Sequence, residues 1–250
     1  FTVRGGDNQS PAWMDSRRLT FGSNRGGVQK IYVVSSGGTP APLFTAEVAA
    51  ARNPAHWIRP PRLLAMYEID PIRRRDVLVY RVKESVTPVV ATSANERSPA
   101  LSPDGRWIAY VSDASGRDEV YITPLDGSME AIQMTSSGAA EPVWTREGLF
   151  YREGERMMLV ALDAGAPGAL QEIFAGRFER DPGANLAAYD VDGRGGFIML
   201  KSALVPRELR VVLDLLAHRR LGPVQQQRDV YVAAILTLTR TRAGPAVPAL

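Results

Sequence analysis

Residues 96–123 read ERSPALSPDGRWIAYVSDASGRDEVYIT, and this stretch decides the fold. Ser102-Pro103-Asp104-Gly105 is a tight turn, because proline fixes the first corner, aspartate tolerates the second and glycine adopts the left-handed conformation. Residues 106–112 after it are typical of a strand. Apolar side chains alternate onto both of its faces, so we expect other layers to cover both.

The rest of this stretch predicts three neighbours for that strand. Residues 96–101 come before the turn, residues 119–123 follow a second turn, and residues 131–135 follow a third break at Asp126-Gly127-Ser128. Four short strands joined by tight turns and apolar on both faces are typical of one blade of a β-propeller.

The same unit recurs along the chain in copies that match this motif less closely. Further copies open at residues 8–13, 52–57, 141–144 and 188–191, and in the second copy residues 58–61 replace the expected turn. Equivalent positions, spaced by 43, 45, 43 and 45 residues, are Trp13, His56, Leu101, Trp144 and Tyr189. This period suits a four-stranded blade. A β-sandwich is the alternative, but it would not repeat Pro-x-aromatic before each turn at a near-constant period.

The sequence therefore predicts an all-β protein, a β-propeller with about five visible four-stranded blades. We expect the propeller to cover residues 1–205 and a C-terminal tail to cover 206–250. In the tail, residues 208–214 are a closing strand or the start of a helix, and residues 215–220 look helical. Residues 222–250 are expected to be poorly ordered or loosely docked.

Composition excludes several classes of function. The chain of 250 residues has no cysteine, which excludes a disulfide scaffold or a thiolate metal site. The absence of cysteine suits an extracytoplasmic protein, and a cytoplasmic location is equally allowed. The net charge is only +3, and residues 206–250 carry seven arginines against three acidic residues. The remainder is near neutral, so we expect no nucleic-acid partner. No apolar run approaches the roughly 20 residues of a membrane span.

Candidate catalytic groups are scarce. There are two histidines, and His56 lies at a strand position where a packed side chain is expected. No Gly-x-Ser-x-Gly motif and no phosphate-binding glycine-rich loop with lysine are present. Asp190-Val191-Asp192-Gly193 is interpreted as a blade turn, not a calcium loop. We therefore expect no enzyme activity within this chain, no metal and no cofactor.

One polar pattern remains as a candidate binding site. Polar residues lie just before or at the start of the first strand of each copy: Asn8, Gln9, Arg52, Asn53, Glu96, Arg97 and Glu141. In a propeller the innermost strands surround the central channel, so these side chains would gather at one channel mouth. Loops on a rigid scaffold commonly hold ligands there. Simple solvation of connecting loops is the alternative.

The repeated theme resembles the TolB-like β-propeller repeat of bacteria. It is carried best by residues 102–110 with Pro99, and it is echoed by Pro11 with Trp13 and by Pro142 with Trp144. The resemblance covers roughly residues 5–202 and implies a ring of six blades. Such blades occur in periplasmic TolB, in propellers of prolyl-oligopeptidase-type peptidases and in extracytoplasmic parts of bacterial serine/threonine kinases and regulators. Residues 208–214 resemble the C-terminal end of the kinase-linked proteins.

These observations lead to two hypotheses. The first is a non-catalytic propeller that binds or senses a protein, peptide or small ligand at the channel mouth. It would be periplasmic or extracytoplasmic, as part of a serine/threonine kinase or regulator. The alternative is the gating propeller of a prolyl-oligopeptidase-type serine peptidase, with its hydrolase domain outside this chain.

Overall fold

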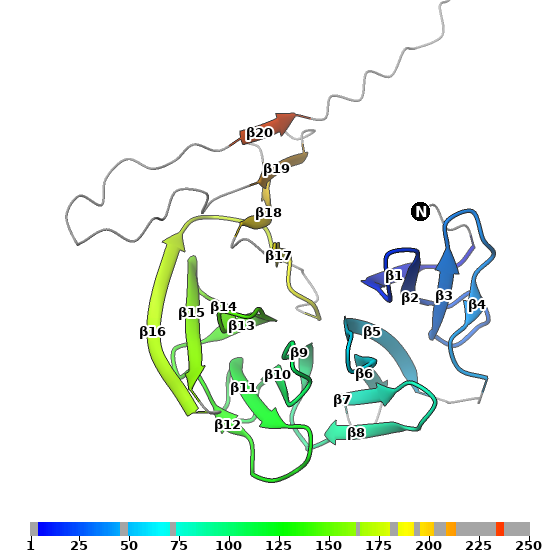
Figure 1. Ribbon diagram of the computed structural model, residues 1–250, viewed down its shortest axis with the longest axis horizontal. Coiled ribbons are helices and arrows are strands. Elements are labelled where there is room, and N and C mark those ends of the chain that lie inside the picture. Colours follow the sequence, from blue (N-terminus) through cyan, green and yellow to red (C-terminus); the bar gives the residue numbers. More distant parts are fainter. Residues whose placement is uncertain are drawn as a thin grey trace, which may run out of the picture. The chain divides into compact units, whose positions relative to one another are not determined.

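The computed structural model describes residues 5–45, 50–70, 74–163, 166–180, 185–192, 196–202, 209–213 and 234–237. The strands in these ranges form five four-stranded antiparallel sheets, each with its strands in chain order, and the ranges contain no helix (Figure 1). This confirms the prediction of an all-β protein with five visible blades.

We call the sheets blades 1 to 5. Blade 1 contains β1 (Asn8–Trp13), β2 (Arg18–Ser23), β3 (Lys30–Ser35) and β4 (Ala41–Pro42). Blade 2 contains β5 (Ala51–Ile58), β6 (Leu63–Asp70), β7 (Arg74–Arg81) and β8 (Val86–Val90). Blade 3 contains β9 (Arg97–Leu101), β10 (Trp107–Ser112), β11 (Glu119–Pro124) and β12 (Ile132–Gln133). Blade 4 contains β13 (Ala139–Trp144), β14 (Leu149–Glu153), β15 (Arg156–Asp163) and β16 (Ala166–Ala175).

Blade 5 contains β17 (Tyr189–Val191), β18 (Phe197–Ser202), β19 (Leu209–Leu213) and β20 (Ala234–Thr237). Its last two strands come from the part of the chain predicted as a tail, and β19 matches the closing-strand alternative. The helix predicted for residues 215–220 lies outside the described residues. Blades 1 to 4 belong to one compact unit and blade 5 to a second.

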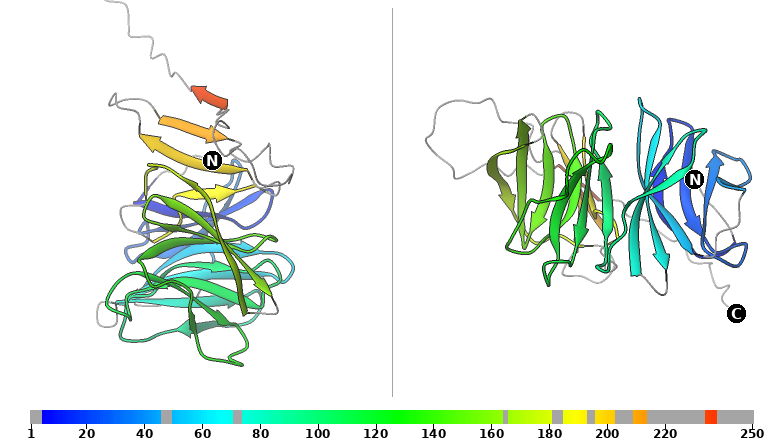
Figure 2. Two further views of the ribbon diagram at one scale, coloured as in Figure 1. Left: turned by 90° about the vertical axis from the view of Figure 1, so that its left-hand side faces the viewer. Right: turned by 90° about the horizontal axis from the view of Figure 1, so that it is seen from below.

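Within the first unit, neighbouring blades pack face to face, as the two-sided apolar strands predict. Between blades 2 and 3, for example, Ala65 and Val79 pack against Leu101 and Ile108. Comparable clusters join blade 1 to blade 2 and blade 3 to blade 4. Figure 2 shows the strands of these four blades, coloured blue to green. Burial of both faces explains why the strands carry almost no polar alternation.

The Ser-Pro-Asp-Gly turn forms as predicted. Gly105 N–H donates to the carbonyl of Ser102 (2.9 Å), and the Ser102 hydroxyl donates to Asp104 Oδ1 (2.6 Å). The same carboxylate oxygen accepts the Arg106 N–H (3.0 Å), while Trp107 N–H donates to Ser102 Oγ (2.9 Å). The turn thereby satisfies its own polar groups and fixes the start of β10.

Gly105 has a φ of 70°, in the left-handed region, and a Cβ there would lie 2.6 Å from Cγ of Pro61 in blade 2. Gly105→Ala is therefore expected to lower the free energy of unfolding by about 2 kcal/mol, because left-handed alanine alone costs about 1–2 kcal/mol. Gly127→Ala is the matched control: its φ is 68°, but a Cβ there meets nothing within 4 Å. Urea denaturation should show the larger loss for Gly105→Ala; equal losses would contradict the contact with Pro61.

In blades 1 to 4 the proline of the first strand marks a β-bulge, and this bulge corrects one predicted position. In blades 1, 3 and 4 the residue before the proline has positive φ, namely Ser10, Ser98 and Glu141. In blade 2 the irregularity instead falls between Pro54 and His56. All four strands have one extra residue at this point, but Pro54 lies one residue earlier in its bulge than Pro11, Pro99 and Pro142 do in theirs.

As a result, Trp57 and not His56 is equivalent to the other repeat positions. Trp57 pairs with Leu64 and packs toward blade 1, as Leu101 packs toward blade 2 and Trp144 toward blade 3. From Trp13, the spacings become 44, 44 and 43 residues. The prediction of His56 is wrong because it counts from the proline, and the proline of blade 2 lies one residue earlier relative to the bulge.

Candidate functional site

The predicted polar residues lie at one end of the first strands of the first unit. β1 contacts β5, β5 contacts β9, and β9 contacts β13, so these strands are neighbours near the middle of Figure 1. We call the end where the chain enters them the entry end. The opposite end, where each first strand turns into the second, is the turn end.

Blades 1 and 2 share an amide cluster at the entry end. Gln9 and Gln29 each donate from Nε2 to Oδ1 of Asn53, both at 3.0 Å. Asn53 is fully buried, and its Nδ2 has no hydrogen-bond partner among the described residues. Gly22 makes room for this cluster, because a Cβ there would lie 2.0 Å from Asn53 Oδ1. Asn53 therefore holds Gln9 in place instead of contacting solvent.

Two further predicted residues on blades 1 and 2 reach solvent. Asn8 is exposed, and its Oδ1 accepts a hydrogen bond from Arg25 (2.9 Å). Arg52 is half-buried and pairs with Glu68, with 2.6 Å between Nε and Oε2. With Gln9, which is also exposed, these side chains form a set that we call the entry rim: Asn8, Gln9 and Arg52.

Glu96, on blade 3, is buried with only 1% of its surface exposed. Burial raises the pKa of this carboxyl, and the nearby Asp76 and Asp113 raise it further, against a hydrogen bond from Thr92. Its Oε2 has no partner among the described residues. Its neighbour Arg97 is also buried and pairs with Asp118. Neither side chain presents a free surface to a large ligand.

Glu141 forms a buried ion pair within blade 4. Its Oε2 accepts a hydrogen bond from Arg152 NH1 at 3.2 Å, and the two side chains are 2% and 3% exposed. Thus Asn53, Glu96, Arg97 and Glu141 are buried, whereas the side chains of the entry rim reach solvent. The partners Glu68, Asp118 and Arg152 carry no recognisable sequence signal, because they belong to other segments of their blades.

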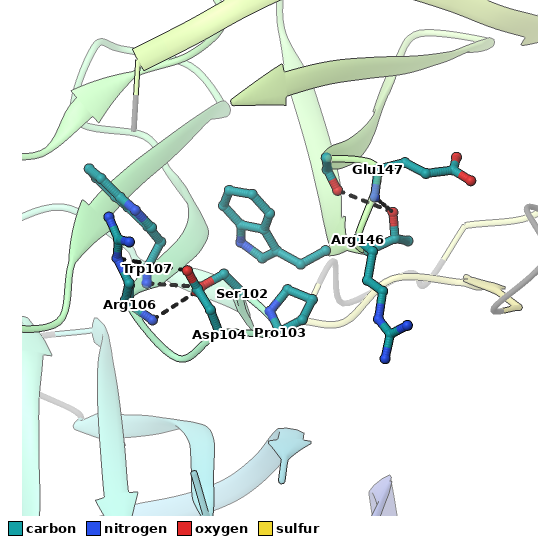
Figure 3. A pocket seen from close by; sticks show the side chains of 10 residues that line it. Ser102, Pro103, Asp104, Arg106, Trp107, Arg146 and Glu147 are labelled. Carbon is teal, nitrogen blue, oxygen red and sulfur yellow. Dashed lines mark hydrogen bonds and ion pairs between the residues drawn. The ribbon is translucent and has the colours of Figure 1, made fainter. Parts of the chain in front are cut away.

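The turn end carries a hollow that the sequence reasoning missed. A cavity of about 380 Å³ lies between the β9–β10 turn and the β13–β14 turn (Figure 3). Its lining comprises Ser102, Pro103, Asp104, Arg106, Trp107, Trp144, Thr145, Arg146, Glu147 and Gly148. We call it the turn cavity. Trp107 and Trp144 pack in the core cluster between blades 3 and 4, and both also form the wall of the cavity.

Other candidate chemistry adds nothing to these two sites. Asp192 belongs to a turn, since its N–H donates to the Gly196 carbonyl and its Oδ1 accepts the Gly196 N–H, both at 2.8 Å. In the described part of the chain no group of three or more His, Asp or Glu side chains is placed to hold a metal ion. The same residues contain no helix long and apolar enough to cross a membrane.

Two curated proteins share part of the sequence, although no protein-family model matches the chain. The Tol-Pal system protein TolB of Azoarcus sp. (strain BH72) is 31% identical over 72 residues, which is 28% of this chain and 17% of that protein. TolB of Polaromonas sp. (strain JS666 / ATCC BAA-500) is 36% identical over 61 residues, 24% of this chain and 14% of that protein. The chain thus spans less than a fifth of the length of these relatives.

Solved structures match a larger share of the chain than these two relatives do. A putative TolB from Agrobacterium tumefaciens matches with a TM-score of 0.61 at 16% identity, over 84% of this chain and 78% of that one. TolB from Acinetobacter baumannii gives 0.59 at 14% identity, over 83% and 51%. A puromycin-hydrolyzing peptidase of Mycobacterium tuberculosis gives 0.56 at 16% identity, over 84% and 37%. The fold is a TolB-like β-propeller.

Proposed function

We propose that this propeller is a non-catalytic binding and sensing module that recognises a protein or peptide at the entry rim. The observation that carries the proposal is the way the rim is held. Gln9 is fixed by the buried Asn53, and Arg52 is fixed by Glu68. Side chains that are already ordered lose less conformational entropy when a partner binds, which favours recognition.

The chemistry of the rim indicates what it would recognise. Arg52 offers a guanidinium, while Asn8 and Gln9 offer amides that both donate and accept hydrogen bonds. Such a mixed set suits a polypeptide surface with carboxylate and backbone groups, and it lacks the concentrated positive charge of a nucleic-acid interface.

The cellular setting is a further part of the proposal. We infer an extracytoplasmic module of a larger bacterial protein, a serine/threonine kinase or regulator. The supports are the absence of cysteine, the partial similarity to Tol-Pal system proteins, and the resemblance of residues 208–214 to the kinase-linked proteins.

Site-specific photo-crosslinking tests the use of the rim. A benzophenone amino acid at position 8 is expected to capture a discrete partner from periplasmic and membrane fractions, in competition with excess unlabelled propeller. The same probe at Met129, exposed in the β11–β12 turn at the turn end, is the control. Gln9→Ala should reduce capture about fivefold to tenfold, as loss of one central interface contact does. Equal capture from both positions, or no effect of Gln9→Ala, would contradict the proposal.

A second candidate function rests on the peptidase matches. The chain resembles more than a third of the M. tuberculosis puromycin-hydrolyzing peptidase, and a prolyl endopeptidase matches over 36% of its length with a TM-score of 0.54. In this reading the propeller would gate a hydrolase domain carried elsewhere, since this chain has no Gly-x-Ser-x-Gly motif of its own. The entry rim would then select substrates.

A further inference from the structure

The turn cavity is built from two adjacent repeats and is separate from the entry rim. It lies between the β9–β10 turn of blade 3 and the β13–β14 turn of blade 4, both in the first unit. β9 runs from Arg97 at the entry end to Leu101 before the turn, a distance of about 13 Å at about 3.3 Å per residue. A ligand in the turn cavity would therefore not compete with a partner at the entry rim.

The polar groups of the two turns are largely satisfied within the turns. The Ser102 hydroxyl and the Asp104 carboxylate bond to each other and to the backbone of β10. In the other turn, Thr145 Oγ1 accepts the Glu147 N–H (3.1 Å), and Thr145 N–H donates to the Gly148 carbonyl (2.9 Å). These groups shape the cavity and have little capacity left for a ligand.

The groups that remain are mainly donors. Trp144 is 8% exposed, and its buried indole Nε1–H has no acceptor among the described residues. A buried donor without an acceptor costs free energy, so a ligand that supplies one is favoured. Arg106 and Arg146 stand on the two sides of the cavity, and Arg106 Nε is 3.7 Å from Asp104 Oδ2, too long for a hydrogen bond (Figure 3).

The two carboxylates of the lining do not cancel this preference. Burial raises the pKa of Asp104, but hydrogen bonds from the Ser102 hydroxyl and the Arg106 N–H lower it by more, so the pKa is lowered overall. The carboxylate is therefore charged, and these donors already bind it. Glu147 is exposed, and its side chain points away from that of Arg146 (Figure 3). Neither carboxylate bonds the Trp144 indole N–H, so a ligand that carries an acceptor can satisfy this donor.

We propose that the turn cavity binds an extended peptide segment that carries a carboxylate side chain. A peptide carbonyl or the carboxylate accepts the Trp144 indole N–H, and the guanidinium groups of Arg106 and Arg146 bind the charge at the rim. Trp107 and Pro103 provide an apolar wall for an adjacent proline or alkyl group. The volume of about 380 Å³ lies within the roughly 300–1,000 Å³ typical of ligand sites.

The four tryptophans of the chain make this proposal directly measurable. In a ¹⁵N–¹H correlation spectrum of the full chain each indole gives one side-chain signal, and single Trp→Phe variants assign them. The probe is acetyl-Ala-Pro-Glu-amide, and acetyl-Ala-Pro-Gln-amide is its uncharged match. Trp57 is the internal control, because its Nε1–H already donates to Thr20 Oγ1 at 2.9 Å.

The expected result is a saturable shift of the Trp144 indole signal with the glutamate peptide, while the Trp57 signal stays in place. The glutamine peptide should bind about tenfold more weakly, as the loss of a charge-assisted hydrogen bond predicts. Arg146→Ala, an exposed change that leaves the spectrum folded, should weaken binding about fivefold. An unmoved Trp144 signal would overturn the site, and equal binding of the two peptides would overturn the carboxylate. Neither result bears on the entry rim.

Discussion

Arg152→Met is expected to lower the free energy of unfolding by about 3–5 kcal/mol, because it removes the guanidinium that pairs with the buried Glu141 carboxylate. Arg152 NH1 lies 3.2 Å from Glu141 Oε2, and both side chains are almost completely buried in blade 4. Glu141 also has a φ of 60°, so its backbone is already held in a costly conformation at the bulge. A loss of this size is a large part of the roughly 5–15 kcal/mol that stabilises a typical domain.

The double variant Glu141→Gln/Arg152→Met separates the buried charge from the loss of packing. Removing both charges should recover about half or more of the unfolding free energy that Arg152→Met loses. The reason is that a neutral amide at position 141 avoids most of the cost of desolvating a carboxylate. Urea denaturation followed by tryptophan fluorescence measures all variants. If Arg152→Met costs less than about 1 kcal/mol, as exposed pairs do, then the pair is not buried as described.

The second large effect is a loss of stability on mild acidification, caused by His56. Burial lowers the pKa of this imidazole to about 4 from its ordinary 6.5, and its Nδ1 accepts the Leu101 N–H of blade 3 at 3.1 Å. The unfolded chain therefore takes up a proton below about pH 6.5, and the folded chain only near pH 4. Stability is complete above pH 6.5 and falls between pH 6.5 and 4. The full shift corresponds to about 3 kcal/mol, and partial solvent access to the ring reduces the expected loss to about 2 kcal/mol.

His56→Asn is the matched control for this pH dependence. The asparagine Oδ1 can accept the Leu101 N–H in place of Nδ1, and it does not titrate. The difference in unfolding free energy between wild type and variant should fall steadily from pH 7 to pH 4. Arg18 holds the pKa of Asp15 at about 2, so this carboxylate loses its contribution only below about pH 4. A difference that stays constant with pH would show that His56 is not desolvated.

The blade was predictable because its signals are local. The Ser-Pro-Asp-Gly turn forms the hydrogen bonds that its residue types favour, and residues 106–112 place apolar side chains on both faces as their alternation predicts. The place of Pro54 relative to the bulge of blade 2 was not predictable from the motif. It depends on which residue near Pro54 is left unpaired with β6. Packing against the neighbouring blades decides which residue this is.

For the candidate site, the sequence predicts where its residues lie along the first strands, but not which of them are buried or what they pair with. In the sequence, a charged residue such as Arg97 or Glu141 looks like a solvated loop residue until its partner is known. The partners Asp118, just before β11, and Arg152, on β14, are distant in the motif. The turn cavity was missed for a related reason. Trp144 does pack between blades, but only the three-dimensional arrangement shows that its indole N–H has no acceptor among the described residues.

The most direct test of the proposed sensing function is to sequence the gene on both sides of the segment that encodes these 250 residues. The account predicts a kinase or regulator domain and a membrane-spanning segment in the same reading frame, which would place the entry rim outside the cytoplasm. A hydrolase domain with a Gly-x-Ser-x-Gly motif and a catalytic histidine in that frame would contradict it and make the propeller a peptidase gate.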